Sequence, residues 1–151
     1  MTAPCAAPRN GGVHTMVRCL WGRHHGTVAD RRVRVWVVDD QASFRMAAAA
    51  TLDAMDGFEI AGQCDSGEAA IEGLRHAAAD MVLMDIHMPG MGGIDAARAI
   101  SAQHPGLVLV LMSTYDFADL PAAAADCGAA SYLHKERLCP DVLSRIWRAA
   151  G

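Results

Sequence analysis

The chain has 151 residues, the length of one ordinary domain, and 52% of them are hydrophobic, which is enough for a substantial core. The formal net charge of −4 gives no electrostatic reason to expect nucleic-acid binding, and no apolar run of about 18 residues predicts a transmembrane helix. Five cysteines without C-x-x-C spacing argue against a disulfide framework and a zinc site, and they favour a reducing, cytoplasmic location.

The N-terminal segment differs in pattern from the rest of the chain. Residues 1–31 contain scattered prolines and glycines and show no sustained hydrophobic period, whereas the chain becomes regular after Arg32. We therefore expect a disordered leader over residues 1–31 and one folded domain over residues 32–151.

Five apolar segments predict β-strands, and each is followed by a segment that predicts a helix. The first helix is expected to have Ser43 as its N-cap, and Pro121 is tolerable only in the first turn of the fourth helix. The predicted strands are residues 33–38, 58–64, 81–84, 107–112 and 131–134. The predicted helices are residues 43–55, 66–78, 94–104, 117–127 and 140–149.

This alternation of strands and helices predicts an α/β fold, in which a parallel sheet is covered by helices on both faces. The third strand is apolar throughout, as expected for a strand buried on both faces. In open sheets of this kind the chemistry lies beyond the carboxyl ends of the strands, where the strand order reverses.

Polar side chains follow four of the five predicted strands. The first strand ends at Asp39 and Asp40, and the third ends at Asp85. The fourth ends at Ser113, and the fifth ends at Lys135, which is the only lysine of the chain. Because the carboxyl ends of parallel strands meet at one edge, we expect these five residues to form a single site.

Three carboxylates at one edge would repel each other unless a cation lay among them, and a hard divalent ion such as Mg²⁺ suits oxygen ligands. We expect Asp40 and Asp85 to bind Mg²⁺ directly and Asp39 to act through water. The backbone carbonyl of His87, two residues beyond Asp85, is a further expected ligand.

An aspartate beside a metal ion can also attack phosphorus and form an aspartyl-phosphate. Asp85 is the candidate phosphoacceptor. The ammonium group of Lys135 and the hydroxyl group of Ser113 would neutralise two of the phosphoryl oxygens, as phosphoryl transfer requires.

Each of these residues also has a plainer interpretation when it is taken alone. Asp39 and Asp40 could cap the helix that begins near Ser43, and Ser113 could be a capping hydroxyl. Lys135 alone could be a solvated surface charge. Their joint placement at strand ends favours the functional interpretation.

Four segments of the sequence resemble the receiver domain of two-component response regulators, and the match runs from Val33 to the end of the chain. The family implies a flavodoxin-like (CheY-like) fold with strand order 2-1-3-4-5. The continuation QASFR and the ending STYD are most similar to the NarL/FixJ (LuxR-type) subgroup. The segments are VRVWVVDDQASFR, DMVLMDIHMPGMGGIDAAR, LVLVLMSTYD and GAASYLHKE.

The resemblance implies that a sensor histidine kinase phosphorylates Asp85 with Mg²⁺ as the cofactor. It also implies that Ser113 and Tyr132 form a switch that remodels the face made by the fourth helix, fifth strand and fifth helix, a surface for a homodimer or another partner. His87, Thr114 and Tyr115 occupy positions that would modulate the lifetime of the phosphoryl group.

One departure from the subgroup concerns the output domain. NarL-like proteins carry a DNA-binding helix-turn-helix domain of roughly 60 residues after the receiver, whereas this chain ends at Gly151. We therefore expect no output domain and no DNA binding by this chain, which would be a stand-alone receiver or part of a transcription regulator.

Two other functions stay open on the sequence. One is an interaction module that works without phosphorylation. The other is a small hydrolase with an aspartyl-phosphate intermediate, although such enzymes of the haloacid dehalogenase type carry D-x-D after the first strand, where this chain has DDQ. A receiver would not be a conventional enzyme, because it assists only its own phosphorylation and dephosphorylation.

Overall fold

The computed structural model describes residues 31–151, and residues 32–151 form one compact unit. The predicted leader lies outside the described residues except for Arg31. The strands are β1 (Val33–Val38), β2 (Phe58–Cys64), β3 (Met81–Asp85), β4 (Val108–Ser113) and β5 (Ser131–His134). The helices are α2 (Ala42–Asp53), α3 (Gly67–His76), α4 (Gly93–Gln103), α5 (Pro140–Ala150) and the 3-10 turns η1 (Phe117–Asp119), η2 (Ala122–Asp126) and η3 (Lys135–Arg137).

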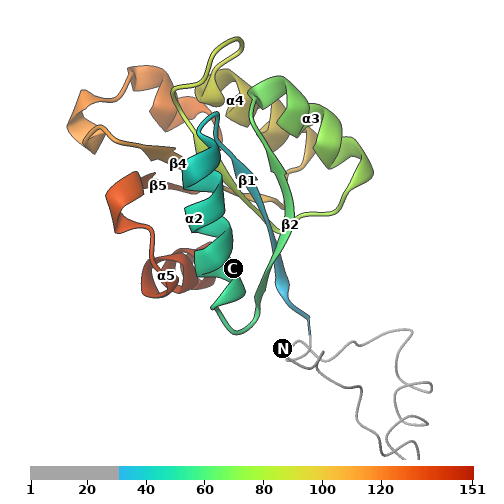
Figure 1. Ribbon diagram of the computed structural model, residues 1–151. Helices are drawn as coiled ribbons and strands as arrows, with labels where there is room; N and C mark the ends of the chain where they lie inside the picture. The colour runs from blue at the N-terminus through green and yellow to red at the C-terminus, as the bar shows by residue number, and fades with distance from the viewer. Residues whose placement is uncertain (1–30) are drawn as a thin grey trace, which may run out of the picture. The chain divides into compact units, whose positions relative to one another are not determined.

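The five strands form one parallel sheet in the order β2-β1-β3-β4-β5, which confirms the predicted flavodoxin-like fold (Figure 1). Helices α2 and α5 pack on one face of the sheet, and α3 and α4 pack on the other. Alternate residues of β1 serve the two sides: Val35 and Val37 face α2 and α5, whereas Trp36 and Val38 face α3 and α4. The central strands β3 and β4 are buried along their whole length, as their continuous apolar sequence indicates.

The strand ends differ from the prediction in one useful way. β3 includes Asp85 and β4 includes Ser113, so both polar side chains stand on the last residue of a hydrogen-bonded strand rather than in a loop. Asp85 is in register with Met112, and the ladder fixes where its side chain lies.

The predicted helix over residues 117–127 is wrong. The chain forms η1 and η2 instead, with Pro121 between them as the N-cap of η2. Proline has no N–H to donate, and the turns are closed by bonds of the i to i−3 type, such as Leu120 N–H to the Phe117 carbonyl. Residues 31–151 therefore contain four α-helices and not the five expected.

Two smaller findings concern helix capping and cysteines. Ser43 is not the N-cap of the first predicted helix, because α2 begins at Ala42 and its N-cap is Gln41, which makes no side-chain capping bond. Within residues 31–151, Cys64, Cys127 and Cys139 are free thiols. Among the described residues, no helix is both long and apolar enough to span a bilayer.

Trp36 on β1 fills the space between the sheet and α3, and two glycines make room for its ring. A Cβ atom at Gly62 would lie 2.5 Å from the indole, and one at Gly73 would lie 2.4 Å from it. Both distances are far below van der Waals contact, so the glycines are required by the indole and not by their backbone angles.

We expect Gly73→Ala to destabilise the protein, although alanine is more favourable than glycine inside a helix by about 1 kcal/mol. Overpacking against Trp36 should cost more, and the free energy of unfolding should fall by about 1–3 kcal/mol in urea titrations. Gly106→Ala is the matched control, because a Cβ there meets no atom within 4 Å. Equal stability of the two variants would contradict the tight packing of the indole.

Candidate functional site

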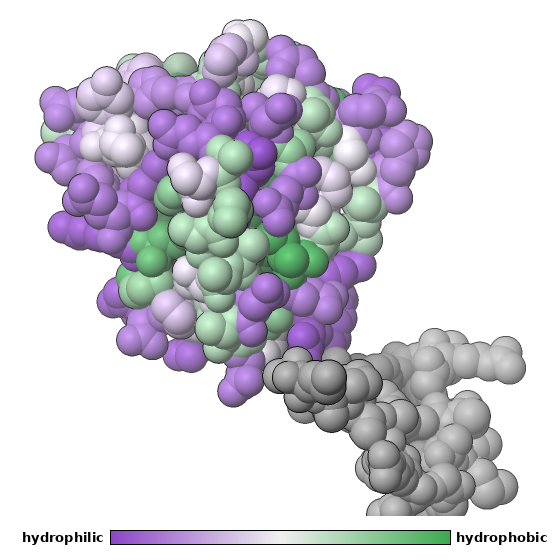
Figure 2. All heavy atoms as spheres, in the orientation of Figure 1, coloured by the Kyte–Doolittle hydropathy of each residue, from purple (hydrophilic) through white to green (hydrophobic). Residues whose placement is uncertain are grey.

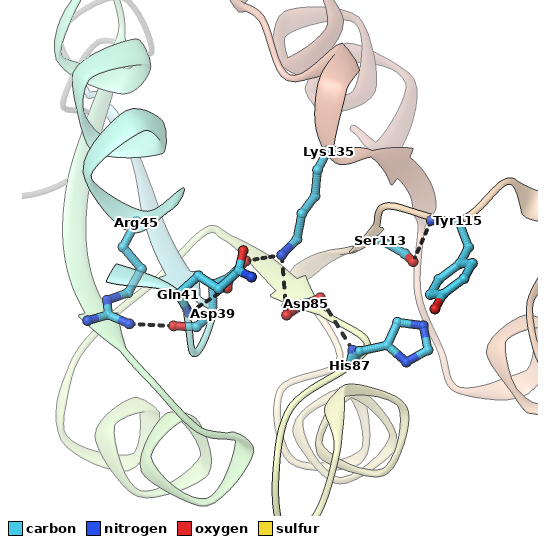
Figure 3. A network of polar contacts seen from close by, with 8 residues as sticks. All are labelled: Asp39, Gln41, Arg45, Asp85, His87, Ser113, Tyr115 and Lys135. Atoms are coloured by element: carbon cyan, nitrogen blue, oxygen red, sulfur yellow. Dashed lines mark hydrogen bonds and ion pairs between the residues drawn. The ribbon is translucent and has the colours of Figure 1, made fainter. Parts of the chain in front are cut away.

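The polar residues predicted to form one site do lie together at the carboxyl edge of the sheet (Figure 3). Asp39 follows β1, Asp85 ends β3 and Lys135 follows β5. β1 and β3 are neighbours although β2 lies between them in the chain, so the site sits where the strand order reverses. Parallel topology thereby joins residues that are far apart in sequence.

Three carboxylates form the acidic part of the site. One oxygen from each of Asp39, Asp40 and Asp85 lies within 4.8 Å of the others. Asp39 and Asp85 are buried, at 0% and 3% exposure, whereas Asp40 is exposed. An all-oxygen set with one open side fits the preference of Mg²⁺ for carboxylates and retained water.

Burial raises the pKa of Asp85 above its ordinary value, and the negative charge of Asp39 raises it further. Lys135 and the hydrogen bond from the His87 N–H act in the opposite direction but do not cancel these effects. Asp85 therefore holds its charge at a cost to the folded state, which a cation at the site would relieve.

Lys135 lies between the two buried carboxylates. Its Nζ atom is 2.6 Å from Oδ2 of Asp39 and 3.3 Å from Oδ2 of Asp85, and its side chain is only 9% exposed. The Phe44 ring supports the ammonium from α2, with Nζ 4.7 Å from the ring centroid. This lysine is a buried counter-ion and not the solvated surface charge considered above.

Backbone groups and a guanidinium orient the carboxylates. The Gln41 N–H donates to Oδ1 of Asp39 at 2.9 Å, and Arg45 donates to the Asp39 carbonyl at 2.5 Å. The His87 N–H donates to Oδ1 of Asp85 at 3.3 Å. Gln41 and Arg45 were not among the residues predicted for the site. Aspartate side chains often accept a hydrogen bond from the backbone N–H two residues further on, so the Gln41 contact could have been predicted. Nothing in the sequence indicates the Arg45 contact.

The turn after Asp85 packs closely against the backbone of Asp85. A Cβ at Gly93 would lie 1.9 Å from the Asp85 carbonyl oxygen, so only glycine fits there. On the outer side of this turn, Oε1 of Glu68 accepts a hydrogen bond from the Met91 N–H at 2.8 Å. Glu68 was likewise not among the residues predicted for the site.

The segment after β4 forms the opposite wall of the site. Oγ of the buried Ser113 accepts a hydrogen bond from the Tyr115 N–H at 3.0 Å. The Tyr115 ring meets the His87 ring edge to face, with centroids 4.9 Å apart. The predicted modulating residues His87 and Tyr115 are therefore paired, and both are exposed.

Side chains of β5 hold the same segment through its carbonyl groups. The Tyr132 hydroxyl donates to the Tyr115 carbonyl, and His134 bonds the Thr114 carbonyl at 2.9 Å. The predicted switch residue Tyr132 is thus linked to the Ser113 segment, and it also packs against Phe117 at a centroid distance of 5.8 Å. The Thr114 side chain itself is exposed.

Fold and site together define an α/β domain with a lysine-paired acidic site at the switch point of a parallel sheet. The model of the response regulator receiver domain matches residues 35–146. The chain belongs to this family, as predicted.

Comparisons with single proteins agree with this assignment. The chain is 37% identical over 103 residues to the response regulator GacA of Pseudomonas viridiflava, which covers 68% of this chain and 48% of the relative. It is 33% identical over 114 residues to the response regulator UvrY of Escherichia coli K12, covering 76% and 52% of the two chains. The chain therefore spans about half the length of these relatives.

Among solved structures, the signal receiver domain of the putative response regulator NarL from Mycobacterium tuberculosis has a TM-score of 0.72 and 29% identity, and the match covers 80% of this chain and 97% of that one. The response regulator domain of Thermotoga maritima CheB has a TM-score of 0.70 and 27% identity, with the same coverage. The similarity to a NarL receiver is in line with the predicted subgroup.

The raised pKa of Asp85 predicts a pH-dependent effect of Asp85→Asn. The folded state holds this proton more tightly than the unfolded chain, so the stability of the wild type falls as pH rises through the folded-state pKa. In metal-free buffer at neutral pH, we expect Asp85→Asn to raise the melting temperature. The gain should shrink as pH approaches the ordinary aspartate value of 3.8.

Circular dichroism melts from pH about 4 to about 7 would measure this difference. Asp126→Asn is the control, because it removes one charge at an exposed position. If Asp85→Asn were less stable than wild type at neutral pH, the carboxylate of Asp85 would be stabilised and not penalised by its surroundings.

Proposed function

We propose that this chain is a phosphorylatable receiver of a two-component phosphorelay, in which a sensor histidine kinase transfers a phosphoryl group to Asp85. The observation that carries the proposal is the buried Asp85 carboxylate with the Lys135 ammonium 3.3 Å away. A nucleophile and a cation at this spacing are what an aspartyl-phosphate requires.

In the proposed reaction, a carboxylate oxygen of Asp85 attacks the phosphorus of the donor. The new P–O bond forms as the P–N bond to the kinase histidine breaks, and the released imidazole nitrogen takes up a proton. Lys135 faces the oxygen Oδ2 and would neutralise one phosphoryl oxygen, while the Ser113 hydroxyl would donate to another. Because the Ser113 oxygen accepts from the Tyr115 N–H, its own hydrogen remains available for that bond.

Asp39, Asp40, Asp85 and the carbonyl of His87 are the residues that would hold Mg²⁺. Both oxygens of Asp39 are already engaged, by Gln41 N–H and by Lys135, which supports a role for this residue through water. Asp40 is the exposed member of the set and is proposed as a direct ligand. A bound Mg²⁺ would supply charge neutralisation for the incoming phosphoryl group.

The apolar outer face of α2 is the proposed contact for the kinase. Figure 2 shows a pale green band of apolar side chains along this helix, which includes Met46 at 72% exposure and the exposed Ala47 and Ala50. α2 begins three residues after Asp39, so a protein bound to it lies next to the acidic site. A donor histidine carried by that protein would be close to Asp85.

The proposed output face is built from η1, η2, β5 and α5. A groove of about 650 Å³ runs between β5 and α5 and is lined by Phe117, Tyr132 and Ile146. Phe117 is 67% exposed, and Tyr132 links the groove to the segment that follows Ser113. We propose that phosphorylation changes this face and that a homodimer or a downstream partner binds there, with His87, Thr114 and Tyr115 modulating the lifetime of the signal.

We propose that residues 32–151 are the receiver and residues 1–31 a leader, that the receiver works in the cytoplasm and that this chain does not bind DNA by itself. The matched segments cover about half of the relatives named above, which are response regulators, and this supports a link to transcription regulation. Catalysis would be limited to the receiver's own phosphorylation and dephosphorylation.

Incubation with Mg²⁺ and acetyl phosphate should add one phosphoryl group to the protein, seen as an intact-mass increase. The adduct should be absent from Asp85→Asn and from samples with excess chelator, because the first lacks the nucleophile and the second lacks the metal. Asp95→Asn is the matched control, since Asp95 is an exposed carboxylate in the first turn of α4.

The same experiment separates the alternatives. An unmodified wild type would favour an interaction module that works without phosphorylation. Continuous hydrolysis of diverse phosphate esters would favour the small hydrolase. A sequence-specific DNA complex at physiological salt would contradict the expected absence of DNA binding.

Asp40→Asn should raise the Mg²⁺ concentration needed for half-maximal phosphorylation by about tenfold or more, because it removes a charged ligand. The melting temperature in metal-free buffer should not fall, since Asp40 is exposed and lies in the acidic cluster. Titration of Mg²⁺ against the phosphorylation rate provides the measurement. An unchanged Mg²⁺ requirement would remove Asp40 from the proposed ligand set.

A further inference from the structure

His134, the last residue of β5, makes two hydrogen bonds, one through each nitrogen of its ring. Its Nε2 atom lies 2.9 Å from the Thr114 carbonyl oxygen, and its Nδ1 atom accepts from the Glu136 N–H at 3.2 Å. The second bond makes His134 the N-cap of η3, the turn that begins at Lys135.

The two bonds fix the protonation state of the ring. A backbone N–H can only donate, so Nδ1 must be unprotonated, and a carbonyl oxygen can only accept, so Nε2 must carry the proton. His134 is therefore the neutral Nε2–H tautomer. The cap on η3 selects the tautomer that can donate to Thr114.

The position of His134 at the end of β5 determines which part of the chain its Nε2–H group binds. In the β4–β5 ladder, Ser113 is in register with His134, and this is the last pair. The imidazole reaches one residue further and bonds Thr114, so the side chain extends the ladder beyond the end of the strand. The peptide that follows the Ser113 hydroxyl is thereby held against the residue that precedes Lys135.

We propose that His134 is a positioning residue for the phosphorylation of Asp85. This inference rests on the proposed function. By holding the Thr114 carbonyl, His134 keeps the Ser113 hydroxyl and the Lys135 ammonium at a fixed separation, so that both meet the phosphoryl group without rearrangement. His134 does not touch the reacting atoms.

Three substitutions separate the two bonds. Glutamine places an N–H donor where Nε2 lies and loses the acceptor, asparagine places an acceptor where Nδ1 lies and loses the donor, and leucine loses both. The side-chain amide of glutamine always carries an N–H donor, so His134→Gln can donate to the Thr114 carbonyl without the bond from the Glu136 N–H. We therefore expect His134→Gln to be phosphorylated within about twofold of the wild-type rate, and His134→Asn and His134→Leu to be slower by about three- to tenfold.

The rates would be measured with acetyl phosphate at saturating Mg²⁺ on samples whose melting curves show that they are folded. His76→Leu is the matched control, because His76 is an exposed histidine whose bond to Glu72 lies on the surface of α3. In the wild type, nitrogen NMR of the imidazole should report the Nε2–H tautomer at neutral pH. This measurement does not depend on phosphorylation.

The outcomes distinguish this inference from the function on which it rests. Equal rates for all three His134 variants, or an Nδ1–H tautomer in the wild type, would overturn the positioning role while phosphorylation of Asp85 stood. A glutamine variant as slow as leucine would show that the Thr114 bond is not the one that matters, and would also overturn it. A wild type that accepts no phosphoryl group would overturn the proposed function and this inference with it.

Discussion

The ion pairs of Lys135 with Asp39 and Asp85 are the interaction on which the rest of the site depends. Two carboxylates with almost no exposed surface cannot both stay charged in a protein interior unless a cation accompanies them. The ammonium supplies that charge from a third strand end, and Phe44 packs against it from α2. The pKa of Asp85 nevertheless stays raised, so the pairing is incomplete and leaves the site favourable for a further cation.

The sheet order is what makes this pairing possible. Because β1 and β3 are adjacent and β4 and β5 follow, strand ends that carry Asp39, Asp85, Ser113 and Lys135 meet at one edge. The strands themselves could be placed from the sequence because β3 and β4 are buried on both faces and therefore apolar throughout. The same reasoning located Asp39, Asp85 and Ser113, since each follows directly on an apolar run.

Other features depend on contacts that no local pattern records. A helix was predicted over residues 117–127, but Pro121 interrupts the hydrogen bonds and the chain forms two 3-10 turns. Phe44 lies in the first turn of α2, and its contact with Lys135 arises only when the sheet brings the ends of β1 and β5 to the same edge. Sequence reasoning therefore finds the charged centre of the site more readily than the residues that orient it.

The segment after Ser113 is held differently from the turn after Asp85, and the difference bears on how a signal could leave the site. The turn after Asp85 is fixed by packing, because Gly93 lies directly against the Asp85 carbonyl. The segment after Ser113 is fixed by side chains of β5, since Tyr132 and His134 bond two successive carbonyl groups. A displacement of Ser113 must therefore break these bonds or move Tyr132 and His134, both of which line the groove beside α5 together with Phe117. The hydrogen bonds that position the hydroxyl thus also couple it to the exposed face.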